Sequence, residues 1–320
     1  ENGAVPMIVP FLKAYQNLGK VMGGETGVTS CGWGDAVVIV PLAMYKAYGD
    51  IRILEENYDA MQRWIEYIND RAQNHHPKGY ETWDEEHKAR SKYLWNTDFH
   101  YGDWLVPSMV LGNPDGGAMV ETAYKTKEVV APAYYAFTAR SMAEVAAALG
   151  KEADADSYRQ LYEKIKKAFA EEYIRKDGTI QSDLQGVYVI ALKNNLVPEA
   201  QKPAVIKRLR ELIKNNRGCL DTGFLSILFL MDVLCENDCR DVAYSLLYQK
   251  QCPSWLYEVE HGATTMWESW GAIGEDGTVS TYSYNHYAFG CVGEWMYREL
   301  GGIQAKLPGY KKIVIKPALD

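Results

Sequence analysis

Glu268 lies between two tryptophans in the stretch Trp267-Glu268-Ser269-Trp270, which follows a turn of small residues that includes two threonines. An indole face can cover the apolar C–H face of a pyranose ring, and a carboxylate can accept hydroxyl hydrogen bonds or activate water. These residue types at this spacing are what a pocket that processes a sugar needs. The alternative is an edge of the hydrophobic core beside one solvated charge. The rest of the chain has to decide between the two interpretations.

A second cluster of acids and aromatic residues lies between Asp98 and Trp104, where a loop meets a regular element. The whole chain of 320 residues carries 23 Tyr and nine Trp, an aromatic content that suits a neutral ligand rich in hydroxyl groups. Its net charge of −8 argues against a nucleic-acid partner, which would require a basic surface. No apolar run approaches the roughly 18 residues of a membrane span.

The six cysteines form no Cys-x-x-Cys pair, and no nearby histidine completes a zinc pattern. Buried free thiols are the favoured interpretation, and disulfides remain the alternative. His75 and His76 are adjacent in a polar segment over residues 71–100, which is poor geometry for one metal site, so we expect both to face solvent. We therefore expect neither a metal ion nor a cofactor. The compartment and a possible homo-oligomeric state are left open by the sequence.

The elements that must position these residues are helical. Apolar residues recur at helical spacing, with Gly or Asn at the ends of several segments. The expected helices cover residues 36–48, 50–68, 131–149, 156–173, 184–194, 198–215, 224–235, 240–250 and 283–300. One short helix is also expected within residues 1–33, and one short strand over residues 311–315.

Successive helical hairpins of this kind form either an α-solenoid or a closed α/α toroid. No motif repeats at a fixed period, and the loops between hairpins differ in length and content, which disfavours a solenoid. In a toroid, long loops on one rim converge on a central pocket, and here those loops carry most of the tryptophans and acids. We therefore predict an all-α toroid.

Four stretches in the chain resemble the bacterial alpha-L-rhamnosidases, whose catalytic domain is an (α/α)6 barrel. The resemblance covers nearly the whole chain, and the order and spacing of the stretches match as well. They are Gly32-Trp33-Gly34-Asp35-Ala36, Tyr101-Gly102-Asp103-Trp104-Leu105, the run from Pro253-Ser254-Trp255 to Trp267-Glu268, and Asn285-His286-Tyr287-Ala288 with Pro308-Gly309-Tyr310.

The resemblance implies roles for individual residues. Glu268 resembles the family's general base, which activates water for inverting attack on the anomeric carbon. Further positions are expected to bind a rhamnose-containing oligosaccharide or glycoside. They are Trp33, Asp35, Asp103, Trp104, Trp267 and His286. Asp35 and Asp103 suit a helix cap or a loop anchor equally well.

One departure from the family pattern concerns the general acid. The family's segment Asp-Cys-Pro-x-Arg-Glu belongs upstream of Gly32, and residues 1–35 contain no counterpart. We therefore expect the general acid upstream of Glu1, an incomplete toroid over residues 1–308, a C-terminal β segment beginning at residues 309–320, and weak or no activity of this chain alone. The alternatives are another inverting glycosidase on an α/α toroid and a non-catalytic carbohydrate-binding fragment.

Overall fold

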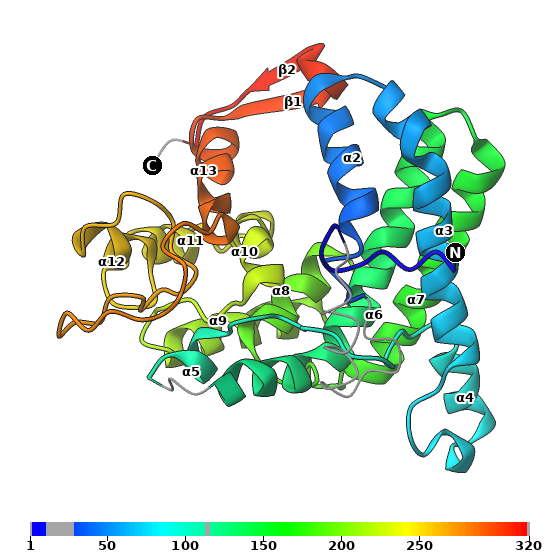
Figure 1. Cartoon of the computed structure of the whole chain (residues 1–320), viewed down its shortest axis with the longest axis horizontal. Helices are drawn as coiled ribbons and strands as arrows, with labels where there is room; N and C mark the ends of the chain where they lie inside the picture. The colour runs from blue at the N-terminus through cyan, green and yellow to red at the C-terminus, as the bar shows by residue number, and fades with distance from the viewer. Residues whose placement is uncertain (1, 11–28, 113–115, 319–320) are drawn as a thin grey trace. The chain divides into compact units, whose positions relative to one another are not determined.

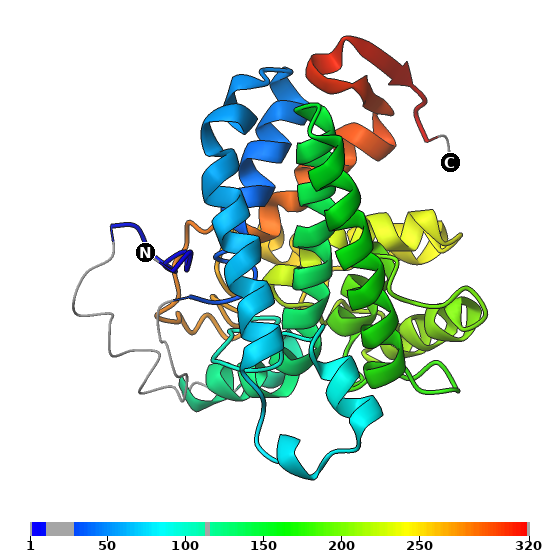
Figure 2. The same ribbon diagram turned by 90° about the vertical axis from the view of Figure 1, so that its right-hand side faces the viewer.

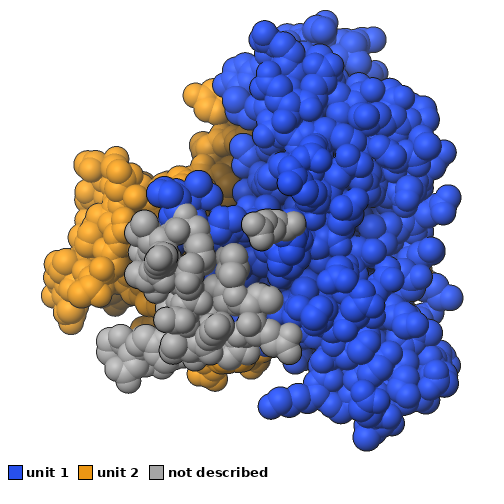
Figure 3. Space-filling view, turned by 45° about the vertical axis from the view of Figure 1, so that its right-hand side comes forward, with its two compact units in different colours: residues 1–102, 127–173, 302–317 blue, residues 103–126, 174–301, 318–320 orange. Residues whose placement is uncertain are grey.

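The computed structural model describes residues 2–10, 29–112 and 116–318. The chain forms two compact units, each assembled from separated segments (Figure 3). Unit 1 comprises residues 1–102, 127–173 and 302–317, and unit 2 comprises residues 103–126, 174–301 and 318–320. The helix expected within residues 1–33 falls mostly on residues 11–28, outside the described part.

Unit 1 begins with a helical hairpin formed by α2 (Ala36–Tyr48) and α3 (Arg52–Asn74), which pack against each other (Figure 2). Gly49 ends α2 in the left-handed conformation at φ 73°, and its N–H donates to the Tyr45 carbonyl at 2.7 Å. Glycine adopts this conformation without the strain that a Cβ causes. The first helix has the predicted bounds, whereas α3 runs past residue 68.

The second pair of helices consists of α6 (Gly116–Ala148) and α7 (Glu152–Tyr173). The expected start of α6 at residue 131 was wrong, because the helix begins at Gly116 and its first turns belong to unit 2. Gly150 ends α6 in the left-handed conformation, and the Lys151 N–H donates to the Ala146 carbonyl at 2.9 Å. This bond satisfies one of the carbonyls that a helix end leaves unpaired.

The polar segment over residues 71–100 contains regular helical structure. It contains η2 (Tyr80–Thr82) and α4 (Glu85–Ser91), and α4 packs against α7. His76 is partly buried rather than solvent-facing, because its ring stacks on Tyr80 with centroids 3.7 Å apart, whereas the His75 side chain is 37% exposed. Beneath them, the Arg71 guanidinium forms an ion pair with the Asp98 carboxylate in the interior of unit 1.

Unit 2 contains two helical pairs close to the predicted ranges. They are α8 (Gln185–Lys193) with α9 (Lys202–Asn215), and α10 (Phe224–Glu236) with α11 (Arg240–Leu247). Helix α8 packs against both α9 and α10, and α8 and α10 supply many of the buried apolar side chains of unit 2. The short helices α5 (Pro107–Val110) and α12 (Trp255–Glu260) complete this unit.

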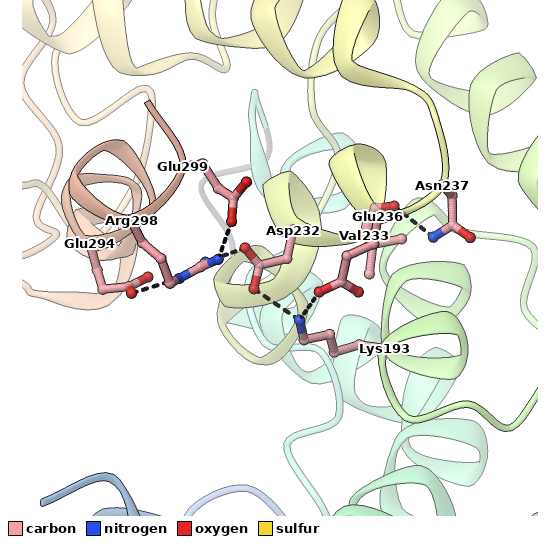
Figure 4. Close-up of polar contacts among 8 residues, drawn as sticks. All are labelled: Lys193, Asp232, Val233, Glu236, Asn237, Glu294, Arg298 and Glu299. Carbon is pink, nitrogen blue, oxygen red and sulfur yellow. Dashed lines mark hydrogen bonds and ion pairs between the residues drawn. The ribbon is translucent and has the colours of Figure 1, made fainter. Parts of the chain in front are cut away.

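The helix expected over residues 283–300 is wrong in its first third. Residues 283–287 are not helical, and helical turns follow only as η3 (Ala288–Gly290), α13 (Cys291–Trp295) and the π-helical η4 (Met296–Leu300). A network of charges joins these turns to α8 and α10 (Figure 4). In it, the Asp232 carboxylate pairs with Lys193 at 3.0 Å and with Arg298.

A β-hairpin follows, with β1 (Ile303–Leu307) antiparallel to β2 (Lys312–Ile315) and η5 (Pro308–Tyr310) at the turn (Figure 1). The second strand matches the prediction, and the first was missed. The turn η5 packs against the end of α2, where Gly309 lies close to Gly49. The predicted boundary between residues 1–308 and 309–320 falls between the two strands and stays a prediction.

All six cysteines have free thiols, and Cys31, Cys219 and Cys239 are buried, which confirms the favoured interpretation for these three residues. Across the described ranges, no helix is both long and apolar enough to cross a membrane.

Candidate active site

Glu268 lies in a non-helical segment of unit 2 that pairs with residues 283–286. The Glu268 N–H donates to the Ser283 carbonyl at 2.9 Å, and the Ser283 N–H donates to Glu268 Oε2, also at 2.9 Å. Nearby, the His286 N–H donates to the Met266 carbonyl at 2.8 Å. These bonds bring Glu268 and His286, two of the predicted site residues, into one local structure. They also explain why the predicted helix does not start at residue 283.

The Glu268 carboxylate is only half-buried. Its Oε2 is held by the Ser283 N–H, whereas its Oε1 accepts no hydrogen bond from the residues that the structure describes. A carboxylate fixed through one oxygen, with lone pairs free on the other, has the arrangement that a general base requires to orient and deprotonate a water molecule.

The two tryptophans that flank Glu268 are buried. Trp267 is 3% exposed and packs edge-on against Tyr284 with ring centroids 5.7 Å apart, and Trp270 stacks on Phe289 at 4.1 Å. Glu268 is the partly exposed residue between the buried Trp267 and Ser269. The geometry supports a packing role for Trp267, and its predicted contact with a sugar stays a prediction.

His286 belongs to an aromatic group that sequence reasoning did not identify. Its ring stacks on Phe224 at a centroid distance of 4.8 Å and on Tyr287 at 5.5 Å. Tyr287 is 89% exposed, an unusual position for a large aromatic ring. The signal for Tyr287 was its place beside His286, whereas Phe224 starts a helix far away in sequence and carries no such signal.

Trp104 is half-buried and packs, together with Phe224, Met119 and Tyr282, on a small apolar cluster. The cluster consists of Leu105, Val110 and Ala118. Because Phe224 also stacks on His286, the structure links Trp104 to the His286 group through this apolar cluster and Phe224.

Asp103 precedes Trp104 and is 1% exposed. Its carboxylate accepts hydrogen bonds from the Gly223 N–H at 2.9 Å, the Ser226 N–H at 3.0 Å and the Ser226 hydroxyl at 2.6 Å. Burial raises the pKa of Asp103 to about 6, although these hydrogen bonds oppose the shift. The carboxylate anchors the start of α10, which supports the anchor role, and its contact with substrate stays a prediction.

Asp35 holds a similar place in unit 1. It is fully buried and accepts hydrogen bonds from the Gly32 N–H at 2.7 Å, Trp64 Nε1 at 2.8 Å and the Thr138 hydroxyl at 2.7 Å. Burial raises its pKa. Trp33 is half-buried, with its ring 4.6 Å from that of Tyr101. Asp35 therefore fixes the turn that carries Trp33, and both residues belong to unit 1, whereas the other predicted site residues belong to unit 2.

Sequence reasoning missed a second acid beside Glu268. Glu258 on α12 is 2% exposed, and its Oε2 accepts a hydrogen bond from the Trp267 N–H at 3.4 Å. Burial raises the pKa of Glu258 to about 8, so that its carboxyl is largely protonated at neutral pH. In the described part of the chain, no group of three or more His, Cys, Asp or Glu side chains has an arrangement that could hold a metal ion.

Residues 1–300 match the family model of the bacterial alpha-L-rhamnosidase six-hairpin glycosidase domain. The chain belongs to this family of helical-hairpin glycosidase domains. It is 40% identical over 297 residues to an alpha-L-rhamnosidase of Streptomyces avermitilis, covering 92% of this chain and 25% of that protein. It is 33% identical over 322 residues to an alpha-L-rhamnosidase of Formosa agariphila, covering 99% of this chain and 31% of that protein.

Solved structures agree with this assignment. The crystal structure of Streptomyces avermitilis alpha-L-rhamnosidase complexed with L-rhamnose matches with a TM-score of 0.81 at 37% identity, covering 100% of this chain and 27% of that one. Native rhamnosidase from Aspergillus terreus matches with a TM-score of 0.81 at 28% identity, covering 99% and 34%. The predicted fold class, an (α/α)6 domain of helical hairpins, is confirmed. The chain spans about a quarter to a third of the length of these relatives.

Proposed function

We propose that the protein containing this chain hydrolyses terminal alpha-L-rhamnosides with inversion at the anomeric carbon. Its substrate is a rhamnose-containing oligosaccharide or glycoside. Family membership and the L-rhamnose complex of the Streptomyces avermitilis relative support this substrate class.

The observation that carries the proposal is the geometry of Glu268. In an inverting glycosidase one carboxylate removes a proton from water while the water attacks the anomeric carbon. Glu268 Oε2 is fixed by the Ser283 N–H, and Oε1 has no hydrogen-bond partner among the described residues, so Oε1 is the atom that takes the proton. The backbone bonds to residues 283–286 hold this oxygen in a constant direction.

The sugar contacts follow from the half-buried aromatic residues. Trp104 offers a ring face to the apolar side of rhamnose and its methyl group, and the His286 ring supplies a hydrogen bond to a hydroxyl group. For Trp33, a contact with the sugar is what the family motif implies. Asp35 and Asp103 act behind these tryptophans by fixing the turns that carry them.

An inverting hydrolase also requires a carboxyl group about 6.5–9.5 Å from the base to protonate the leaving oxygen. The family motif implies that this proton donor lies outside residues 1–320. The experiments below therefore use the full-length protein.

Hydrolysis of nitrophenyl alpha-L-rhamnoside by the full-length protein tests the assignment. We expect Glu268→Gln to lower kcat by about 10²–10⁴, because the amide cannot accept the proton. Glu275→Gln is the matched control, since Glu275 is an exposed acid a few residues along the same loop region. Wild-type turnover in Glu268→Gln would refute the role of Glu268.

Stereochemistry and specificity are tested separately. NMR of the first product formed should show the anomer opposite to that of the substrate, and retention of configuration would contradict an inverting mechanism. A panel of aryl glycosides should show turnover of the alpha-L-rhamnoside above all others. Preferred turnover of a glucoside or mannoside would instead favour another glycosidase activity, and tight rhamnose binding without turnover would favour a binding module.

A further inference from the structure

Glu258 is the buried acid that the proposed reaction does not use. It lies on α12, whose first turn is capped by the Ser254 hydroxyl accepting from the Tyr257 N–H at 3.1 Å. Its exposure of 2% excludes direct contact with a glycosidic oxygen, so it is not itself the proton donor. Its Oε1 has no hydrogen-bond partner among the described residues, although a buried polar atom is normally paired.

Glu258 makes contact with both ends of the turn that precedes Glu268. Its backbone carbonyl accepts hydrogen bonds from the Ala263 N–H at 3.0 Å and from the His261 N–H at 3.2 Å. Its side chain accepts from the Trp267 N–H at 3.4 Å, one residue before Glu268. A single residue therefore spans the segment from the end of α12 to the predicted base.

We propose that Glu258 is a positioning residue for Glu268, because its buried side chain holds the Trp267 peptide and thereby fixes the direction of the neighbouring carboxylate. This inference rests on the proposed function of Glu268 as the base. The positioning acts from the interior, through the peptide N–H of Trp267. It complements the bonds that Ser283 makes to Glu268 from the other side.

The surroundings of Glu258 favour its neutral form. Within the described residues no cationic side chain forms an ion pair with it, and the titratable group that interacts with it is the Cys252 thiol, next to α12. The pKa of Cys252 is raised to about 12, chiefly by burial, so that this thiol is neutral wherever Glu258 titrates. Arg217, Cys219 and Glu275 act on Cys252 from the surrounding loops, and Glu268 follows Trp267, whose N–H donates to Glu258.

A buried neutral carboxyl with one unpartnered oxygen lowers the stability of the folded protein. We therefore expect Glu258 to contribute to function rather than to stability. Replacement by methionine removes the acceptor while roughly preserving the volume, and replacement by glutamine keeps an acceptor but cannot ionise. If Glu258 had only a structural role, its replacement would lower both the stability and the activity of the protein. If Glu258 positions Glu268, its replacement by methionine lowers the activity without lowering the stability.

The test compares Glu258→Met and Glu258→Gln in the full-length protein, with Glu260→Gln as the control on the exposed side of α12. We expect Glu258→Met to lower kcat roughly tenfold or more, because a small displacement of a catalytic group is costly, while KM is about unchanged and Tm is equal or higher. Glu258→Gln should keep most of the activity, because the amide oxygen can still accept from the Trp267 N–H. Wild-type kcat in Glu258→Met would overturn the proposal.

A readout that does not depend on activity separates this proposal from the proposed function. Hydrogen exchange of a peptide covering residues 261–270 should be faster in Glu258→Met than in the wild type and unchanged in Glu260→Gln. Unaltered exchange in Glu258→Met would overturn the positioning role. A wild-type protein without rhamnosidase activity would refute the proposed function, whatever the exchange experiment shows.

Discussion

The Ser226 hydroxyl donates a 2.6 Å hydrogen bond to the carboxylate of Asp103, which lies 123 positions earlier in the sequence. This bond, with those from the Gly223 and Ser226 N–H groups, ties the turn before Trp104 to the first turn of α10. Phe224, which stacks on His286, belongs to the same helical turn. The buried Asp103 carboxylate thus sets the distance between Trp104 and Phe224, two aromatic residues of the candidate site.

The space around Asp103 makes a test at Gly186 possible. A Cβ added to Gly186 would collide with Asp103 Oδ2 and meet the Ser226 hydroxyl at 2.7 Å. In an open helix the change to alanine gains about 1 kcal/mol, but here we expect Gly186→Ala to lower the free energy of unfolding by roughly 1–3 kcal/mol. Urea unfolding measures the effect. Gly293→Ala in α13 is the control, because nothing lies within 4 Å of its added Cβ and no loss is expected.

The buried ion pair of unit 1 gives a second prediction. Arg71 and Asp98 have side chains only 6% and 2% exposed, with Nη2–Oδ1 at 2.6 Å and Nε–Oδ2 at 2.8 Å. Arg71→Ala leaves the buried Asp98 carboxylate without the guanidinium that pairs with both of its oxygens, so we expect a loss of about 3–5 kcal/mol in the free energy of unfolding.

The exposed pair of Arg63 with Asp59 on the same helix is the comparison. Arg63→Ala should cost less than about 1 kcal/mol, because solvent screens an exposed pair. Equal losses in the two variants would contradict the importance of burial at Arg71.

The raised pKa of Glu258 should make the free energy of unfolding depend on pH in an unusual way. Its pKa rises from 4.5, the value expected in the unfolded chain, to about 8 in the folded protein, so the folded state binds the proton more tightly. The contribution of Glu258 to stability therefore falls as pH rises between about 4.5 and 8 and is constant above that range. Between pH 5 and pH 8.5, the free energy of unfolding should fall more for the wild type than for Glu258→Gln. Parallel behaviour of the two proteins would contradict the shift.

Trp104 should contribute to binding more than to chemistry. An aromatic pair contributes about 0.5–1.5 kcal/mol beyond area burial, and a similar contribution from a ring face against a sugar corresponds to an increase in KM of roughly two- to tenfold for Trp104→Ala. Trp104→Phe keeps a ring on the Leu105 cluster and should change KM less. Steady-state kinetics with nitrophenyl alpha-L-rhamnoside measures both, and a thermal melt of each variant shows whether packing is lost. An unchanged KM in Trp104→Ala would remove this residue from the substrate site.

Local sequence signals were sufficient for most helices. The start of α2 and the ends of α2 and α6 follow from helical periodicity and from Gly49 and Gly150, which act within one or two turns. The error at residues 283–287 has a different origin, since these residues pair with the Glu268 segment instead of forming a helical turn. Strand β1 was missed because Ile303–Leu307 contains a single β-branched residue, whereas β2 contains Ile313, Val314 and Ile315.

In the candidate site, too, local sequence signals identify some residues, whereas the roles of others depend on distant parts of the chain. Glu268 and His286 stood out through motifs, whereas the anchoring of Asp103 depends on Ser226, far away in the sequence. Glu258 resembles an ordinary solvated acid on a short helix, and only the packing around α12 reveals its burial. Sequence patterns identify residue types, but burial and partners are properties of the folded chain.

The pairing of the Glu268 segment with residues 283–286 also determines where residues can be inserted or attached in this region. Backbone hydrogen bonds join its two sides, so the length of the chain between them need not be conserved for Glu268 and His286 to stay together. Residues 275–279 form the exposed tip of that connection, with open space around Gly277. This tip is therefore a natural place for a fluorescent label, an affinity tag or an inserted peptide that reports on the site without displacing its base.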